Sequence, residues 1–173
     1  QSNVLSISEN IDKNKFEIII AAKGGGSFEK RAAESRVSFT PLELPRMLRT
    51  RYLKYLEKIY EAEQFDLIHT HGGVAGFYGR TLKKHNPKLK CVHTIHGLHY
   101  LSSRDYLRKN ISRTIEQYLL QFTDMTICET HNDYLAAVKN RIAGRDNTVI
   151  IPNGINISLY ANLKKNISLL NEL

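Results

Sequence analysis

The sequence predicts an α/β domain built on a Rossmann-like, doubly wound parallel sheet flanked by helices. Short apolar runs rich in β-branched residues end at glycine or proline, which is typical of strands buried on both faces. Amphipathic helical patterns separate these runs, and this alternation favours right-handed βαβ units. The 173 residues are enough for one such domain and too few for two full ones.

Six strands are predicted in chain order. They cover residues 16–22, 37–39, 66–71, 90–96, 125–128 and 148–151. Glycine or proline follows four of them, at residues 24–26, 72–73, 97 and 152–154, and these residue types mark turns.

Helices are predicted at residues 2–10, 74–85 and 131–142 and along two apolar stripes with helical spacing. The stripes are Leu48, Tyr52, Tyr55, Leu56 and Ile59, and then Leu107, Ile111, Ile115, Tyr118, Leu119 and Phe122. We expect both stripes to face the core, because a surface helix normally buries its apolar side.

The domain is expected to cover residues 1–155, with 156–173 as a polar linker toward a further domain. No strand precedes the helix at residues 2–10. In a doubly wound sheet of order 3-2-1-4-5-6 the first strand is central. A chain with that topology would therefore lack its opening, middle strand within these residues.

The charge balance indicates an anionic partner. The chain has 25 Lys and Arg against 17 Asp and Glu, a formal charge of +8. Nucleic acid, an anionic membrane surface and a phosphorylated substrate all fit this excess. Glycine-rich aromatic RNA motifs and zinc-finger spacings do not occur, which makes nucleic acid the weakest of the three.

The two cysteines and the apolar runs indicate in which cellular compartment the protein is located. Cys91 and Cys128 lie inside apolar runs without Cys-x-x-Cys spacing, which predicts buried strand thiols and a cytoplasmic protein. No stretch reaches the roughly 18 apolar residues of a membrane-spanning helix, and the start does not resemble a signal peptide.

Ligands of parallel sheets bind beyond the carboxyl ends of the strands. The residues predicted there are Gly24 to Gly26, His71, Gly72, Gly73, His96, Gly97, Glu129 and Thr130. Glycine lets a ligand approach the backbone, and a following helix N-terminus favours an anion. His69 and His93 are expected to be buried and hydrogen-bonded, while the His69-x-His71 spacing also leaves a metal site open.

Two segments are strongly basic. They contain Arg46, Arg49, Arg51, Lys54 and Lys58, and then Arg104, Arg108, Lys109 and Arg113. Each segment is either a solvated helix face or a contact with anionic lipid headgroups or a pyrophosphate.

Four segments in order resemble the motifs of family-four glycosyltransferases. Residues 65–73 (FDLIHTHGG) resemble the "DxxHxH" strand end, and 92–99 (VHTIHGLH) the "TxHG" strand end. Residues 123–130 (TDMTICET) resemble "ADxIIxxS", and 149–156 (VIIPNGIN) resemble "VIPNGID". The ordered set with suitable gaps is specific, whereas the first 60 residues match in pattern only.

The resemblance implies a retaining glycosyltransferase of hexosyltransferase type with GT-B architecture. In that architecture the N-terminal Rossmann-like domain binds the acceptor and the C-terminal domain binds the nucleotide-sugar. This chain would be the N-terminal domain and inactive alone, with His96 near the reacting centre. The cleft would be lined by His71, Gly72, Gly73, Gly97, Glu129 and Thr130.

The resemblance further implies cell-envelope polysaccharide synthesis with a glycan or lipid-linked acceptor, at the inner face of the plasma membrane. It implies no cofactor and no metal, and leaves the oligomeric state open. Two other functions remain: a metal-dependent hydrolase using His69 and His71 with His93 or His96, and a non-catalytic sensor of sugar-nucleotides or phosphate.

Overall fold

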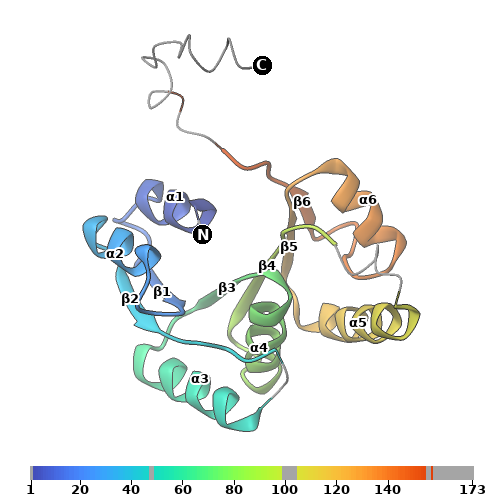
Figure 1. Ribbon diagram of the computed structural model, residues 1–173, viewed down its shortest axis with the longest axis horizontal. Helices are drawn as coiled ribbons and strands as arrows, with labels where there is room; N and C mark the ends of the chain where they lie inside the picture. The colour runs from blue at the N-terminus through green and yellow to red at the C-terminus, as the bar shows by residue number, and fades with distance from the viewer. Residues whose placement is uncertain (1, 47–48, 99–104, 155–156, 158–173) are drawn as a thin grey trace, which may run out of the picture.

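Helices and strands alternate along the chain, as predicted (Figure 1). The computed structural model describes residues 2–46, 49–98, 105–154 and 157. The strands are β1 (Ile19–Ala22), β2 (Ser38–Pro41), β3 (Leu67–His71), β4 (Lys90–Ile95), β5 (Met125–Cys128) and β6 (Thr148–Ile150). The helices are α1 (Ser2–Asn10), α2 (Ser27–Glu34), α3 (Thr50–Glu63), α4 (Gly72–His85), α5 (Tyr106–Leu119), the 3₁₀ turn η2 (Leu120–Phe122) and α6 (His131–Lys139).

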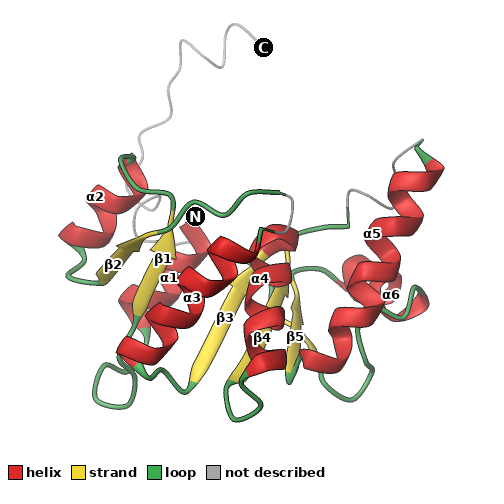
Figure 2. Ribbon diagram, turned by 90° about the horizontal axis from the view of Figure 1, so that it is seen from below, coloured by secondary structure: helices red, strands yellow, loops and turns green. Residues whose placement is uncertain are grey.

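All described strand pairs are parallel, but the strands form two sheets and not the single sheet that the sequence predicts. One sheet has the order β1-β2 and the other β3-β4-β5-β6. In Figures 1 and 2 the break lies between β1 and β3. This is the place of the first strand in a 3-2-1-4-5-6 sheet.

The register of the larger sheet brings its carboxyl ends together. His71 lies opposite Thr94, and Ile95 lies opposite Cys128. The histidine and glycine residues that follow β3 and β4 are therefore neighbours in space, although 25 positions separate His71 from His96 along the chain.

Helix α4 packs closely on β3 and β4 because it carries glycine at two contact positions. A Cβ atom on Gly79 would overlap the Thr70 methyl group, and one on Gly76 would lie 2.5 Å from His93 Cε1. Larger side chains would push the helix away from the sheet. This contact fixes the N-terminus of α4 at the carboxyl end of β3.

The core is divided among three clusters of buried side chains. The first joins α1 to the small sheet, the second joins α3 to α4, and the third joins the ends of β4 and β5 to α6. Their central members are Leu5, Ile20 and Phe28, then Leu56, Tyr78 and Leu82, then Ile95, Cys128 and Ala137. Cys91 and Cys128 are free and fully buried, as predicted, and burial raises the pKa of both thiols to about 11.

The prediction that the strands are buried on both faces is wrong for part of the larger sheet. Leu67 of β3 is 49% exposed, Met125 of β5 41% and Ile150 of β6 39%. Right-handed crossovers place α4, α5 and α6 on one face of the sheet, as Figure 1 shows. Alternate side chains on the opposite face therefore remain accessible.

The prediction that the apolar stripe of α5 faces the core is also wrong. Leu107, Ile111, Ile115 and Tyr118 are exposed, and Leu119 is the one residue of this helix that is fully buried. The stripe of α3 does face the core, through Leu53 and Leu56. Element boundaries shift by a few residues; for instance, β1 begins at Ile19 and leaves Phe16 exposed.

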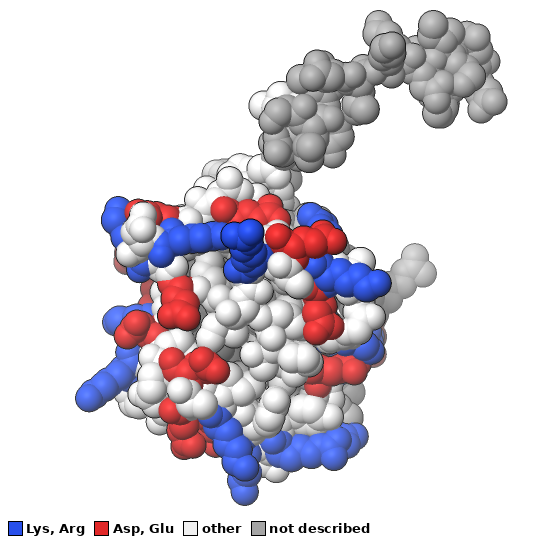
Figure 3. All heavy atoms as spheres, turned by 90° about the vertical axis from the view of Figure 1, so that its left-hand side faces the viewer, with Lys and Arg blue, Asp and Glu red and all other residues white. Residues whose placement is uncertain are grey.

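Some expectations fall on residues outside the described ranges. They concern Leu48 in the first apolar stripe, Arg104 in the second basic segment and the expected linker beyond residue 157. Among the described helices, none has the length and apolar character needed to cross a membrane. Figure 3 shows acidic and basic side chains interspersed around one face with an uncharged central area, so the positive excess is not gathered there.

Candidate functional site

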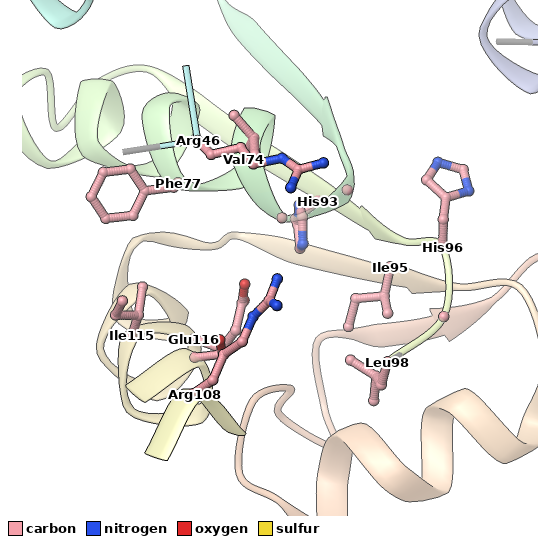
Figure 4. Close-up of a pocket in the computed structure, with 14 residues that line it drawn as sticks. Arg46, Val74, Phe77, His93, Ile95, His96, Leu98, Arg108, Ile115 and Glu116 are labelled. Atoms are coloured by element: carbon pink, nitrogen blue, oxygen red, sulfur yellow. The ribbon is translucent and has the colours of Figure 1, made fainter. Parts of the chain in front are cut away.

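A cleft of about 450 Å³ opens at the carboxyl ends of β3 and β4, between the N-terminus of α4 and helix α5 (Figure 4). Its walls come from segments far apart in the sequence. They are formed by Arg46, Gly72, Gly73, Val74, Phe77, His93, Ile95, His96, Gly97, Leu98, Arg108, Ser112, Ile115 and Glu116. The parallel register places the cleft where open α/β sheets bind ligands.

Glycine shapes the floor of the cleft. Gly72 and Gly97 have φ values of +76° and +84°, a region that side-chain-bearing residues rarely adopt. A Cβ atom on Gly73 would meet nothing within 4 Å. The first turn of α4 therefore presents its free backbone N–H groups to open space, an arrangement that suits an anion.

Two arginines add positive charge to the cleft. Figure 4 shows Arg46 and Arg108 extending toward it from opposite sides. Arg46 precedes α3, and Arg108 lies in the first turn of α5, where its N–H donates to the Asp105 carboxylate at 3.0 Å. Guanidinium groups on both sides and a helix N-terminus below can hold a phosphate or diphosphate.

Beside the cleft, hydrogen bonds link three polar side chains in a row. His71 Nδ1 lies 3.0 Å from His96 Nε2, and His96 Nδ1 lies 2.7 Å from Glu129 Oε1. The His71 and His96 rings stack with centroids 5.2 Å apart. The backbone of His96 lines the cleft, but in Figure 4 its ring turns away from it.

The carboxylate of Glu129 determines the tautomers along this row. It accepts only, so His96 Nδ1 must donate to it. In a neutral His96 ring Nε2 then accepts from His71 Nδ1–H, which leaves His71 Nε2 with a free lone pair. Burial, together with the nearby His69 and His96, lowers the pKa of His71 to about 3. His71 is therefore neutral near pH 7, and its Nε2 can accept a hydrogen bond.

His93 is buried and hydrogen-bonded, as predicted, whereas His69 is hydrogen-bonded but only partly buried. His69 Nε2 lies 2.7 Å from Thr94 Oγ1, and His93 Nδ1 lies 2.9 Å from Thr70 Oγ1. Burial lowers the pKa of His69. Burial and then the charge of Arg80 hold the pKa of His93 well below its usual range.

A buried ion pair joins α4 to α5 beside the cleft. The Arg80 side chain is 1% exposed and donates to Glu116 Oε2 at 2.7 Å and to the Gly76 carbonyl at 2.9 Å. Glu116 and Leu119 lie three positions apart and both point inward. These two inward-pointing residues determine how α5 is rotated about its own axis. The apolar stripe lies on another side of the helix and therefore faces solvent.

The structure gathers most of the predicted site residues but not all of them. His96, Gly72, Gly73, Gly97, Arg46 and Arg108 share the cleft, and His71 and Glu129 join it through His96. Arg46, Arg49 and Arg51 line a second hollow beside α3, whereas Lys54 is exposed on α3 outside both. Thr130 caps α6 by accepting from the Asp133 N–H at 3.0 Å.

Sequence reasoning missed the apolar and acidic walls of the cleft. Phe77, Ser112, Ile115 and Glu116 contribute to it from the middle of α4 and α5. No local pattern distinguishes them from other helix positions, although an acid in the otherwise basic segment of α5 is a clue to a buried partner.

Within the described residues, no group of three or more histidine, cysteine, aspartate or glutamate side chains could hold a metal ion. Both ring nitrogens of His96 and Nδ1 of His71 are engaged in hydrogen bonds, so the pair would offer a metal ion His71 Nε2 and no nitrogen of His96. The donor set therefore does not suit the hydrolase alternative.

Comparison with known proteins identifies what this arrangement is similar to. The profile described as Glycosyltransferase Family 4 matches residues 2–159. An Escherichia coli UDP-Gal:alpha-D-GlcNAc-diphosphoundecaprenol alpha-1,3-galactosyltransferase is 24% identical over 157 residues, which cover 88% of this chain and 41% of that protein.

Solved structures show the same fold. Anabaena HepE in complex with UDP has a TM-score of 0.71 at 13% identity, over 92% of this chain and 42% of that one. A glycosyltransferase from Rickettsia africae has a TM-score of 0.72 at 16% identity, over 98% and 44%. The chain thus spans less than half the length of these relatives.

Proposed function

This chain belongs to glycosyltransferase family 4, and from that premise we propose that it forms the acceptor-binding domain of an enzyme that transfers a sugar from a nucleotide-sugar to a glycan or lipid-linked acceptor. The match to the family profile over residues 2–159 carries the proposal. The E. coli relative is named for an acceptor with a diphosphate and a polyprenyl chain, and we propose an acceptor of this class here.

The cleft supports a diphosphate-bearing acceptor. Arg46 and Arg108 flank it, and the N-terminus of α4 opens into it at Gly72 and Gly73. Val74, Phe77 and Ile115 supply an apolar wall. This combination of charge and apolar surface matches a phosphate group joined to a hydrocarbon chain.

The row of hydrogen-bonded side chains beside the cleft is assigned a positioning role. Glu129 holds the His96 ring in one tautomer, and His96 in turn orients His71. We propose that His96 acts by orienting His71, whose Nε2 is left to hydrogen-bond the reacting sugar, in a reaction that retains the anomeric configuration and transfers a hexose. Stabilisation of the leaving group is assigned to the nucleotide-binding part of the enzyme, since that electrostatic contribution acts on the diphosphate.

We further propose that the enzyme needs no metal, and that it acts at the cytoplasmic face of the plasma membrane in cell-envelope polysaccharide synthesis. An acceptor with a polyprenyl chain resides in a bilayer, so such a location brings enzyme and acceptor together.

Binding by the 173-residue chain tests the acceptor assignment. We expect it to bind a short-chain polyprenyl-diphosphate N-acetylhexosamine, measured by calorimetry. Arg108→Glu should weaken this binding roughly tenfold or more, because it replaces a charge-assisted contact by repulsion. Lys54→Glu is the matched control, since Lys54 is exposed outside the cleft, and should leave affinity unchanged.

Transfer activity tests the reaction itself. The chain extended to the length of its relatives should transfer labelled sugar from a UDP-sugar to the same acceptor, and the 173-residue chain alone should not, because both substrates must be held in register. A chain that binds UDP-sugars tightly and ignores the acceptor analogue would instead be a nucleotide-sugar sensor.

A further inference from the structure

Helix α5 presents an apolar stripe to solvent. Leu107 is 70% exposed, Ile111 51%, Tyr118 49% and Ile115 39%. Their spacing of four, four and three residues places them on one side of the helix. Tyr106, which begins the helix, is 78% exposed. A continuous stripe of this kind on one helix indicates an interaction surface.

No other described helix combines these properties. Helix α3 has the same number of Lys and Arg residues as α5 but balances them with three glutamates, and it turns Leu53 and Leu56 into the core and leaves Tyr55 as its one exposed large apolar side chain. Helix α5 buries only Leu119 fully. The rotation that produces this difference is fixed by the ion pair between Glu116 and the buried Arg80, so the outward orientation of the stripe is built into the fold.

The charges near the stripe are positive. Arg108 borders it, and Lys84 of α4 reaches Tyr118, with Nζ 2.9 Å from the hydroxyl group. Lys109 and Arg113 project from the opposite side of α5. The acid within the helix, Glu116, is neutralised by Arg80. Arg108 and Lys84 lie beside the stripe, so both act within the Debye length of an anionic surface that the stripe contacts.

Tyr118 lies at the C-terminal end of the stripe, and Tyr106 begins the helix on a neighbouring side. Tyr106 and Tyr118 are 12 positions apart, which is about 18 Å along the helix. Tyrosine favours the boundary between headgroups and acyl chains, because its ring is apolar and its hydroxyl group polar. This distribution fits a helix lying in the plane of a bilayer interface.

We propose that α5 docks this domain onto an anionic lipid bilayer, with Leu107, Ile111 and Ile115 among the upper acyl chains and the basic side chains at headgroup level. The proposal deepens the proposed function, since it states how the enzyme reaches a lipid-linked acceptor. Arg108, Ser112 and Ile115 of the same helix line the cleft. A polyprenyl chain in the bilayer would therefore lie beside the opening of the cleft that receives its diphosphate.

A tryptophan probe tests the docking directly, because the chain contains no tryptophan. Leu107→Trp is compared with Phe16→Trp; Phe16 is 54% exposed and precedes β1, a strand that lies far from α5 in Figure 1. Vesicles are phosphatidylcholine alone, or phosphatidylcholine and phosphatidylglycerol in equal parts. We expect the emission of Leu107→Trp to shift to shorter wavelength, and brominated acyl chains to quench it, on the anionic vesicles only. Phe16→Trp should not respond.

Co-sedimentation separates the contributions of apolar and charged groups. The double variant Leu107→Ser/Ile111→Ser should lower partitioning to anionic vesicles by roughly tenfold or more, since two side chains lose their acyl environment. Lys84→Glu should lower it several-fold at low salt, because Lys84 lies beside Tyr118 of the stripe, and Phe16→Ser should have no effect. Equal binding to neutral and anionic vesicles, or no response of Leu107→Trp, overturns the proposal.

Sedimentation without lipid tests whether the stripe is a protein interface instead. Self-association that Leu107→Ser/Ile111→Ser abolishes, with no binding to vesicles, would overturn bilayer docking in favour of a second copy. These measurements need neither donor nor acceptor. If vesicles bind and the extended enzyme transfers no sugar, the proposed function fails and the docking surface stands.

Discussion

Acidification should destabilise the fold through the buried histidines of β3 and β4. In the folded protein the pKa of His71 is lowered from 6.5 to about 3, mainly by burial, and that of His93 lies well below its usual range. In the unfolded chain both titrate near 6.5. Below that pH the unfolded chain binds protons that the folded protein excludes, so stability is full above about pH 7 and falls as the pH decreases.

The size of the effect follows from this difference. Between pH 7 and pH 5 each histidine that stays neutral when folded costs about 2 kcal/mol of unfolding free energy, so His71 and His93 together cost about 4 kcal/mol. The lowered pKa of His69 acts in the same direction. The pKa of Asp124 is lowered from 3.8, so this carboxylate stays ionised in the same window and does not contribute. A loss of this size is a large fraction of the stability of a small domain.

Urea denaturation followed by circular dichroism at pH 7, 6 and 5 measures the loss, and His71→Asn tests its source. The variant should lose about half of the pH dependence, because one of the two excluded protons disappears. Unfolding free energies that agree within about 1 kcal/mol across this range would refute the reasoning, since they would require the histidines to be protonated in the folded state.

Further predictions concern packing, the buried ion pair and the site. Gly79→Ala should destabilise the protein by about 1–3 kcal/mol because its Cβ overlaps a threonine methyl group of β3, whereas Gly73→Ala, which meets nothing within 4 Å, should cost less than about 1 kcal/mol in urea denaturation. Arg80→Met should cost about 3–5 kcal/mol by leaving Glu116 without its partner, and adding Glu116→Gln should restore part of that loss in a double-mutant cycle. In the extended enzyme, His96→Ala should lower turnover on the order of 100-fold and destabilise the protein by about 1–3 kcal/mol, because it leaves Glu129 without its partner. Steady-state rates and melting curves would check both effects; a lower melting temperature with unchanged turnover would make His96 a purely structural residue.

The alternation of elements could be read from the sequence because it depends on local patterns. Apolar β-branched runs that end at glycine gave β3 and β4 with their carboxyl ends at His71 and before His96. The meeting of these ends follows from parallel pairing, so the proximity of His71, His96 and Glu129 was predictable once the fold class was known.

The orientation of α5 could not be predicted from the sequence. Periodicity identifies the apolar side of a helix and assumes that it faces inward. Here Glu116 turns inward to reach Arg80, which lies 36 positions earlier on another helix. A pairing between distant segments thus outweighs the local pattern, and the same pairing places Glu116 and Ile115 in the cleft.

The break between the two sheets divides the molecule into two units that are joined by side-chain contacts, such as those of Leu42, which follows β2 and belongs to the cluster that joins α3 to α4. Within the described ranges no strand ladder links β1 to β3, and Leu5, Ile20 and Phe28 form a cluster separate from those beneath the larger sheet. Cooperativity depends on such shared contacts, and units without them exchange their amide hydrogens with different protection. The amides of β1 and β2 should therefore exchange at lower opening free energy than those of β4 and β5. A strand hydrogen-bonded between β1 and β3 would merge the two units into one cooperative transition.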